Sequence, residues 1–448
     1  MSKTIGGWAT IGLASLFVFM ASCTPVAELQ DALPVATPDT ASVLDSIAED
    51  YVRLSLEIGT KEPGYIDAYY GPAEWKAEAE ANPRGLIDLA NAVIALEERL
   101  DLVDETLLSP MQQKRRTFLL AQLNAARTRL LMLQGETLSF RDEALGLFGV
   151  IPEIKPLSHY DPILERLNKQ FPGKGTLASR IGSIPARHTI APEKLEPVFN
   201  AAIAECRNRT LEHIPLPEDE DFTMAFVTDK PWSGYNYYQG DYRSRIEINT
   251  DLPIRIGRAV DLGCHEGYPG HHVYNMLLER NLSRQRGWVE YQIYPLYSPQ
   301  SLIAEGSANY GIELAFPGEE RLAYEKSVLY PLAGLDPDSA DEMAQLQEAL
   351  RDLSSARFTI AQRYLDSEIS REQAIELTQK YMLFGRNRAE QSISFADTYR
   401  SYVINYGLGL DMVRDYVESA GQDPAMRWAA MAKVLSEPTL PVDLVIVR

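Results

Sequence analysis

Three of the six histidines in this 448-residue sequence fall at positions 265, 271 and 272, and a glutamate follows the first of them. A His-Glu pair opens the zinc-peptidase motif in which a second histidine stands four residues after the first, on the same helix face. Position 269 is a proline, so that spacing fails here, and the next histidines stand six and seven residues after His265. The residue types predict a zinc site whose ligands must be chosen by geometry.

Zinc–nitrogen bonds of about 2.0–2.1 Å require two ligand histidines to bring their ring nitrogens within a few ångströms of each other. A helix rises about 1.5 Å per residue, which would separate His265 from His272 by about 10 Å along the axis. A bulge of two residues would restore the four-residue relation for His271, and Pro269 and Gly270 suit such a bulge. We therefore predict His265 and His271 as ligands, with His272 directed to substrate or to an acid beside the site.

Two glutamates complete the predicted site. Glu266, beside the first ligand, is placed to act as the general base that takes a proton from the attacking water and passes it to the leaving amine. Ser298 and Pro299 predict the N-cap and first position of a helix that carries Glu305, which we expect to be the third ligand.

Further polar residues fall at helical spacing from these ligands. Asn309 and Glu313 share a helix face with Glu305, and Asp261 stands four residues before His265. We expect Asn309 or Asp261 to orient a ligand histidine through a hydrogen bond.

A solvated helix surface is the alternative interpretation of such a His-Glu pair. The flanking residues 259–264 and 273–278 are mainly apolar, however, which predicts a buried helix. Ionisable groups in a buried helix need a compensating partner, and this favours the metal site.

The stretch from His265 to His271 resembles the HExxPGH motif of a bacterial family called "domain of unknown function 885". Residues 305–313 are similar to its EGWAxYxE segment, with Ser307 in place of the tryptophan, and residues 405–409 look like its SYxxG segment. The resemblance extends over about residues 45–440, with the matches confined to 265–313 and 370–409. Tyr274 stands where the family often has glutamine, so the substrate preference is not carried over.

The resemblance implies a largely helical, gluzincin-like zinc metallopeptidase with one Zn²⁺ ion. It implies His265, His271 and Glu305 as ligands, Glu266 as the catalytic acid and base, and Tyr406 as an oxyanion donor. Such a donor is worth about 2.7–4 kcal/mol in other hydrolases. A packed core tyrosine is the alternative for Tyr406. The matched motifs also place Tyr310 and Glu313 near the ligands or the substrate, and Tyr402, Arg386 and Arg388 are weaker candidates to hold the oxyanion or a substrate carboxylate.

The elements that must position these residues are mainly helical. Apolar residues recur every three or four positions over 90–100, 111–133, 339–366 and from 371 onward, which predicts helices there. Residues 222–249 break this pattern and predict two or three strands beside the histidine helix. Such strands could bind an extended peptide or simply cover the core. We expect a large helical, metallopeptidase-like domain over 45–448, with two lobes divided near residues 215 and 216.

The N-terminus looks like a bacterial lipoprotein signal. Lys3 precedes a short apolar stretch, and Met20-Ala21-Ser22 leads to Cys23 in the manner of a lipobox. We predict a signal peptide over 1–22, lipidation of Cys23, a flexible tether over 23–44, and a location on the outer membrane facing the periplasm, because Thr24 is not the aspartate of inner-membrane retention. An ordinary signal peptide cut near Ala21 is the alternative.

Composition narrows the function further. The formal charge of −20 argues against nucleic-acid binding. Cys206 and Cys264 could pair in the periplasm, but we expect two buried free thiols. The sequence therefore predicts a hydrolase of peptides or small amides; the alternatives are a non-catalytic metal-binding envelope lipoprotein and a zinc hydrolase of other amide bonds.

Overall fold

The computed structural model describes residues 40–230 and 232–446. The predicted signal peptide, Cys23 and the first part of the predicted tether lie outside these residues. Helix α1 (Thr40–Gly59) already begins at Thr40, so the tether cannot extend to residue 44 as predicted. The apolar residues of α1 from Leu44 onward are buried, and this burial stabilises the helix. The proline-rich composition before it had suggested that the tether ends later in the chain.

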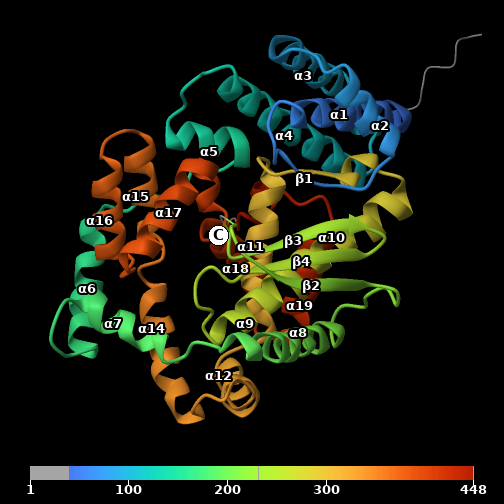
Figure 1. Cartoon of the computed structure of the whole chain (residues 1–448). Helices are drawn as coiled ribbons and strands as arrows, with labels where there is room; N and C mark the ends of the chain where they lie inside the picture. The colour runs from blue at the N-terminus through green and yellow to red at the C-terminus, as the bar shows by residue number, and fades with distance from the viewer. Residues whose placement is uncertain (1–39, 231, 447–448) are drawn as a thin grey trace, which may run out of the picture. The chain divides into compact units, whose positions relative to one another are not determined.

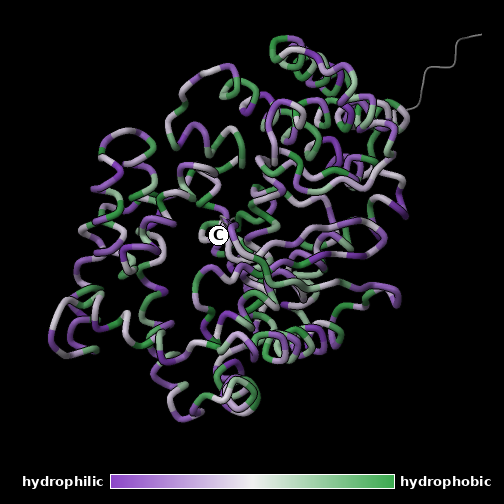
Figure 2. The backbone as a smooth tube through the Cα atoms, in the orientation of Figure 1, coloured by the Kyte–Doolittle hydropathy of each residue, from purple (hydrophilic) through white to green (hydrophobic). Residues whose placement is uncertain are grey.

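The described residues form a mainly helical fold with small sheets, which confirms the predicted fold class (Figure 1). Helices α3 (Leu86–Asp101) and α4 (Pro110–Leu133) contain the two predicted N-terminal helices. Helix α4 begins at a capping box in which Ser109 and Gln112 satisfy each other's backbone groups. Along the helices, polar and apolar segments alternate as expected for helices with one buried face (Figure 2). Within the described residues, no helix is both long and apolar enough to cross a membrane.

The predicted strands form a three-stranded sheet of β2 (Asp221–Val227), β3 (Gly234–Gly240) and β4 (Arg243–Asn249). The order is β2-β4-β3; β4 pairs parallel with β2 and antiparallel with β3. A separate antiparallel pair joins β1 (Ile66–Tyr69) to β5 (Ile293–Pro295). Strand β3 is therefore at an edge of the three-stranded sheet.

Two hydrophobic cores hold the helices together, and neither follows the predicted lobe boundary. The main core runs from Leu44 to Leu444, and the second combines residues around 160–184 with residues 343–393. Both cores draw on chain from before and after residue 215, so the predicted division into two consecutive lobes is wrong. The second core contains α6 (Asp161–Gln170), α7 (Leu177–Ala186), α14 (Ala340–Arg351), α15 (Ala356–Leu365), α16 (Arg371–Tyr381) and α17 (Arg386–Tyr399).

The predicted helix over 339–366 is divided into α14 and α15 by a turn at 352–355. Ser354 and Ser355 lie in this turn, and the Ser355 hydroxyl is hydrogen-bonded to that of Tyr160 at 2.9 Å. The turn lets α15 take a new direction, which the apolar periodicity alone did not reveal.

Helices α10 (His271–Leu278) and α11 (Pro299–Ala315) carry ligand candidates of the site, and α9 (Gly257–Leu262) leads into it. Helices α8 (Leu195–Leu211), α18 (Leu408–Ser419) and α19 (Pro424–Ser436) pack against these elements. Helix α11 approaches α18 closely, because a Cβ atom on Gly306 would lie 2.4 Å from the carbonyl oxygen of Gly409. Ser298 stands at the N-cap position as predicted, but its hydroxyl donates to the carbonyl of Pro295 instead of accepting from the helix. The remaining helices are α2 (Ala73–Ala81), α5 (Phe140–Phe148), α12 (Glu320–Tyr324) and α13 (Tyr330–Ala333).

Candidate metal centre

The histidine motif is not one bulged helix, as predicted, but two helical segments joined by an extended connection. His265 lies in a π-helical turn, Gly263–Gly267, that continues α9, and α10 begins at His271. Between them Tyr268 is extended, and the amide of Gly270 donates to the carbonyl of Cys264 at 3.0 Å. Pro269 lacks an amide hydrogen, so it cannot continue the helical bonding.

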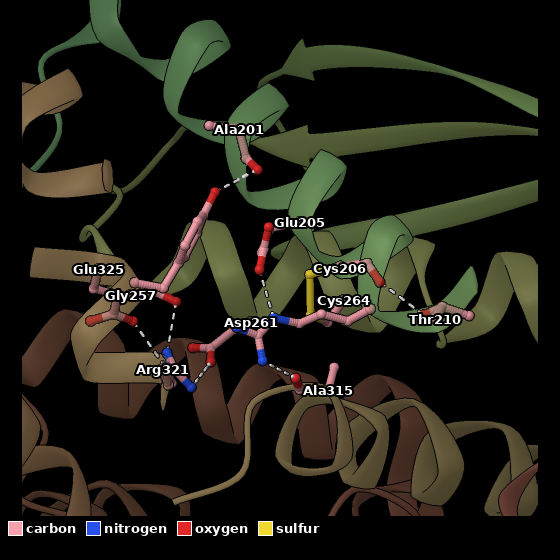
Figure 3. Close-up of a disulfide and its surroundings, with 12 residues drawn as sticks. Ala201, Glu205, Cys206, Thr210, Gly257, Asp261, Cys264, Ala315, Arg321 and Glu325 are labelled. Atoms are coloured by element: carbon pink, nitrogen blue, oxygen red, sulfur yellow. Dashed lines mark hydrogen bonds and ion pairs between the residues drawn. A yellow bond between two sulfur atoms is a disulfide. The ribbon is translucent and has the colours of Figure 1, made fainter. Parts of the chain in front are cut away.

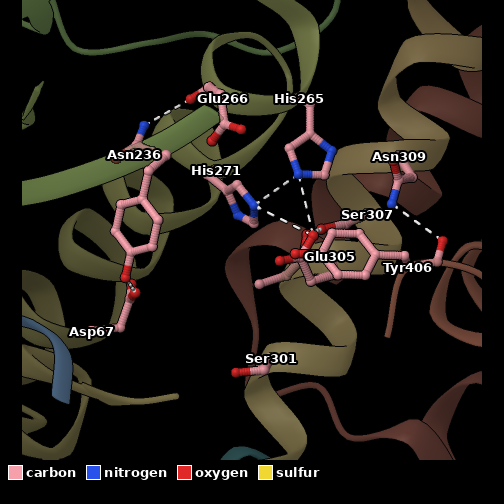
Figure 4. A network of polar contacts seen from close by, with 12 residues as sticks. Asp67, Asn236, His265, Glu266, His271, Ser301, Glu305, Ser307, Asn309 and Tyr406 are labelled. Carbon is pink, nitrogen blue, oxygen red and sulfur yellow. Dashed lines mark hydrogen bonds and ion pairs between the residues drawn. The ribbon is translucent and has the colours of Figure 1, made fainter. Parts of the chain in front are cut away.

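The predicted ligand atoms converge despite this different route (Figure 4). The Nε2 atoms of His265 and His271 are 3.1 Å apart, and they lie 3.2 and 3.8 Å from Oε2 of Glu305. Ligand atoms about 2.0–2.1 Å from one tetrahedral ion stand ~3.3 Å apart. The three side chains are therefore spaced so that they could hold a metal ion.

The Glu305 carboxylate supplies an independent test of this fit. Its Oε1 atom accepts a hydrogen bond of 2.9 Å from the Tyr402 hydroxyl, whereas the buried Oε2 atom accepts none. Burial opposes the charge, but the imidazoles of His265 and His271 outweigh it and lower the pKa of Glu305. A buried carboxylate oxygen without a hydrogen bond is costly unless a cation compensates it. The donor set therefore fits a metal ion.

His271 is affected by the same carboxylate. Burial lowers the pKa of His271, but the charge and proximity of Glu305 outweigh burial and raise it to about 9. A cation binding to the imidazole must displace this proton, so metal binding is coupled to pH.

Glu266 lies beside the ligands without being one of them. Its side chain is buried, and its carboxylate is turned toward His271 (Figure 4). Burial raises the pKa of Glu266, and the imidazoles of His265 and His271 partly oppose this. Strand β3 fixes this residue: Asn236 donates to its backbone carbonyl at 2.7 Å, and a Cβ atom on Gly234 would lie 2.9 Å from its Oε1 atom.

Two further predicted residues lie next to the ligand group. Tyr406 is half-buried, and burial followed by the charges of Glu305 and Glu266 raises its pKa. Asn309 donates to the backbone carbonyl of Tyr406 at 3.2 Å, and not to a ligand histidine as predicted (Figure 4). Asn309 thus holds the segment that carries Tyr406.

The other predicted neighbours are engaged elsewhere. Asp261 is ion-paired with Arg321 at 2.8 Å (Figure 3). It also pairs with Arg258 at 3.3 Å, so its carboxylate does not orient a histidine. Glu313 is ion-paired with Arg414 at 2.8 Å. Tyr310 is buried, and burial raises its pKa to about 12. Arg386 is ion-paired with Glu372 and Glu390 at the surface.

His272 is directed away from the ligand group into a buried polar cluster. Its Nε2 atom lies 3.0 Å from Glu220, and its Nδ1 atom lies 2.8 Å from the Ser244 hydroxyl. Glu220 also accepts from the Tyr268 hydroxyl at 2.5 Å and pairs with Arg207 at 2.7 Å. The structure thus gives His272 an acidic partner, as one of the two predicted alternatives had it.

The hydrogen bonds around Glu220 should make the folded protein less stable in acid. Burial opposes ionisation of Glu220, but hydrogen bonds from His272, Tyr268 and Arg207 outweigh it and lower the pKa from 4.5 to about 2. The resulting stabilisation is present above the ordinary pKa and is lost as pH falls from about 4.5 to about 2. It is on the order of 3 kcal/mol. Urea unfolding of the wild type and Glu220→Gln between pH 7 and 3 should give a shallower pH slope for the variant. Identical slopes would contradict this assignment.

The structure also places Asp67 and Tyr402 near the ligands. The contacts that they make there were not predicted from the sequence. Asp67, on β1, accepts a hydrogen bond from the Tyr235 hydroxyl, and burial raises its pKa to about 6. The charges of His271, Glu305 and Glu266 also act on this carboxyl group. Tyr402, predicted only as a weaker oxyanion candidate, binds Glu305 instead. A single aspartate in a short strand carries no sequence signal that would have found Asp67.

Cys206 and Cys264 form a disulfide, so the expectation of two free thiols is wrong (Figure 3). Helix α8 packs against α9 and the π-helical turn, which brings the two Cα atoms within 5.5 Å. The bond joins α8 to the residue immediately before His265. Packing between segments 58 residues apart is a tertiary property that residue spacing did not disclose.

Removing this disulfide should destabilise the protein. For a loop of 58 residues the chain-entropy model gives about 4 kcal/mol, and typical measured values are about 2–4 kcal/mol. We expect the double variant Cys206→Ala, Cys264→Ala to unfold at lower urea concentration than the oxidised wild type. Chemical reduction of the wild type serves as the matched comparison. Alkylation of both thiols without prior reduction would refute the disulfide.

Comparisons with known proteins give limited similarity. No protein-family model and no curated protein matches the sequence, so the resemblance to the domain of unknown function 885 family remains a prediction. Among solved structures, the chain is similar to a candidate lipoprotein from Colwellia psychrerythraea, with a TM-score of 0.49, 17% identity, and coverage of 80% of this chain and 65% of that one. This chain thus spans slightly less than two thirds of the length of that protein.

Two further solved structures are similar to this chain, with lower TM-scores than the Colwellia protein. A candidate lipoprotein of unknown function from Shewanella oneidensis gives a TM-score of 0.48 at 12% identity, over 93% of this chain and 89% of that one. An M32 carboxypeptidase from Deinococcus radiodurans R1 gives a TM-score of 0.39 at 11% identity, over 88% and 89%. These likenesses assign neither an activity nor a metal to this chain.

Proposed function

We propose that this protein is a zinc-dependent hydrolase that cleaves small peptides. The observation that carries this proposal is the buried Oε2 atom of Glu305, which has no hydrogen bond and lies 3.2 and 3.8 Å from the Nε2 atoms of His265 and His271. Glu266, a buried carboxylate outside this ligand group, lies beside it. Three ligands and a neighbouring base are the parts that a zinc hydrolase requires.

Zinc is the metal we favour, because two imidazoles and one carboxylate are typical zinc ligands. Among the described residues, the group that could hold a metal contains three side chains. Catalytic zinc sites use three protein ligands and structural zinc sites use four, so this number favours a catalytic site. When bound, zinc would polarise the substrate carbonyl and make water nucleophilic at neutral pH.

Residues of the protein would transfer the proton and stabilise the negative charge that develops on the substrate oxygen. Glu266 would take the proton of the attacking water and deliver it to the leaving amine, and its raised pKa brings it closer to neutral pH. Tyr406 is protonated at neutral pH, as any tyrosine is unless its pKa is lowered, and here burial raises that pKa further. It can therefore donate a hydrogen bond to the oxyanion. Tyr402 would position Glu305 through their 2.9 Å hydrogen bond.

Strand β3 supports a peptide substrate. It is the outer strand of its sheet, and β1 packs beside it through the hydrogen bond from Tyr235 to Asp67. Its residues Gly234 and Asn236 contact Glu266. An extended peptide can add to an edge strand by main-chain hydrogen bonds, which would bring a scissile bond beside the general base. Other small amides lack this repeated backbone and would gain less from the strand.

Metal analysis followed by a peptide-library digest tests the proposal. We expect about one zinc per chain, loss of hydrolysis after chelation, and recovery when zinc is added back. His265→Ala and Glu305→Gln should each lower the zinc content, whereas His159→Ala, an exposed histidine, should not. Hydrolysis that persists in the chelated protein would refute a zinc enzyme. Zinc bound without hydrolysis would instead support the non-catalytic envelope protein.

We also propose that Cys23 carries a lipid anchor that holds the protein to the outer membrane on its periplasmic side. The lipobox-like sequence Met20-Ala21-Ser22-Cys23 supports this. Metabolic labelling with palmitate should mark the wild type but not Cys23→Ser. Labelling of both proteins would exclude Cys23 as the lipidated residue.

A further inference from the structure

An arginine cluster of Arg255, Arg258, Arg357 and Arg388 lies near the candidate metal centre. Arg255 precedes α9, Arg258 is on α9, Arg357 is on α15, and Arg388 is on α17. Arg258 pairs with Asp261 at 3.3 Å and donates to Ser233 at 3.0 Å. Over residues 40–230 and 232–446, the other three form no ion pair within 4.0 Å, although the charge of Asp261 acts on Arg255. This is unusual in a sequence that has 63 acidic residues against 43 basic ones.

The guanidinium groups are close enough to repel one another. Burial lowers the pKa of Arg388 to about 9, and the charges of Arg255, Arg258 and Arg357 add to this effect. Residue Arg388 as a whole keeps contact with solvent, whereas its guanidinium is packed against the Phe384 ring, 4.1 Å from the ring centroid. Like charges held together cost free energy, and an anion that binds among them removes that cost.

Arg357 has an unused donor in this cluster. Its Nε atom is buried and has no hydrogen-bond acceptor, and burial lowers the pKa of the group. The neighbouring Phe358 fixes α15 against the Tyr406 segment, because a Cβ atom on Gly407 would lie 2.6 Å from its ring. A buried N–H group without an acceptor is rare in proteins, and a ligand oxygen would satisfy it.

The cluster adjoins the groups that would perform hydrolysis. The charge of Arg258 lowers the pKa of Glu266, and the charge of Arg357 acts in the same direction on Tyr406. Helices α15 and α17 both pack on the 3-10 segment Arg400–Ile404, which carries the Tyr402 that binds Glu305. An anion bound by the cluster would therefore lie near the bond to be cleaved.

We propose that Arg255, Arg357 and Arg388 bind the free C-terminal carboxylate of the peptide substrate, so that the enzyme cleaves near the C-terminus. This inference rests on the proposed hydrolase function. Guanidinium groups match a carboxylate through paired N–H donors, and the cluster offers unused donors on three separate elements. A terminal carboxylate is present on every unblocked peptide, whereas an acidic side chain would restrict the substrate sequence.

The test measures binding separately from hydrolysis. A pooled tripeptide library is prepared as free acids, as C-terminal amides, and as amides with one internal acidic side chain. Calorimetric titration into zinc-loaded Glu266→Gln then compares the three sets. We expect the free acids to bind roughly 10- to 100-fold more tightly than either amide set. We expect Arg388→Gln, made in the same background, to weaken binding of the free acids until it approaches that of the amide sets.

Arg363→Gln is the control, because Arg363 is on α15, the helix that carries Arg357, but pairs with Glu368 at the surface. It should keep the full preference for free acids. Equal binding of acids and amides, or absence of binding by both, would overturn the carboxylate site. Tight binding only of the set with acidic side chains would overturn the C-terminal assignment. Hydrolysis by the wild type is scored separately, so a failure of the proposed function is distinguished from a failure of this inference.

Discussion

Replacing Glu266 with glutamine is expected to lower the turnover number for peptide hydrolysis by about 10²–10⁴-fold while zinc content stays unchanged. Glutamine has almost the same shape but cannot take the proton of the attacking water. Glu266 is 4% exposed and lies outside the ligand group, so the substitution should preserve both packing and metal binding. Single-turnover hydrolysis and metal analysis on the same preparation check both halves of this expectation.

The variant should also be at least as stable as the wild type in the metal-free state. Burial raises the pKa of Glu266, so the ionised form is disfavoured in the folded protein. The stability contribution of such a group is fully present at low pH and is lost as pH rises through the raised pKa. Glutamine does not ionise, so the metal-free variant does not lose this stability at neutral pH. A Glu266→Gln protein that unfolds at lower urea concentration than the metal-free wild type would contradict this account.

Asp67 is the competing base if Glu266→Gln retains most of its activity. Its carboxyl group is influenced electrostatically by the ligands, and burial raises its pKa to about 6. The exposed Glu390→Gln, on α17, is the matched carboxylate-to-amide control and should hydrolyse peptides like the wild type. Full activity in Glu266→Gln together with inactivity in Asp67→Asn would transfer the role of base to Asp67.

The sequence predicted the parts of the site that depend on local spacing. The rise of a helix led to the choice of His265 and His271 over His272. The structure joins the two through an extended connection and not through the predicted bulge. The helices over 90–100 and 111–133 followed from apolar periodicity, and they lie within α3 and α4. The strands around 222–249 were found because alternation interrupts the helical pattern.

Contacts between segments that are distant in the sequence could not be predicted from local residue spacing. Glu313 shares a helix face with Glu305, but eight residues place it about 12 Å further along the axis, where Arg414 from α18 pairs with it. Asp261 was expected to reach a histidine, but Arg321 from a later helix engages it. Asp67 lies on a strand nearly 200 residues before His265, and only the folded chain brings it near the ligands.

The connection between the two histidines decides whether the metal centre can form, and Gly270→Ala tests it. A Cβ atom at Gly270 would lie 1.8 Å from the carbonyl oxygen of His265 and 2.5 Å from that of Cys264. Both contacts are with backbone, so relief requires the chain that carries His265 to move. Its Nε2 atom is only 3.1 Å from that of His271, so such a movement would disturb the ligand geometry.

We therefore expect Gly270→Ala to weaken zinc binding at least about 10-fold and to destabilise the metal-free protein by about 1–3 kcal/mol. Competition with a chelator measures the first effect, and urea unfolding measures the second. Gly182→Ala is the matched control: Gly182 lies within α7, its added Cβ would meet nothing within 4 Å, and alanine is favoured there by about 0.5–1 kcal/mol. Normal zinc affinity in Gly270→Ala would mean that the connection can relax without moving His265, and the close approach at Gly270 would then not be what holds the two histidines together.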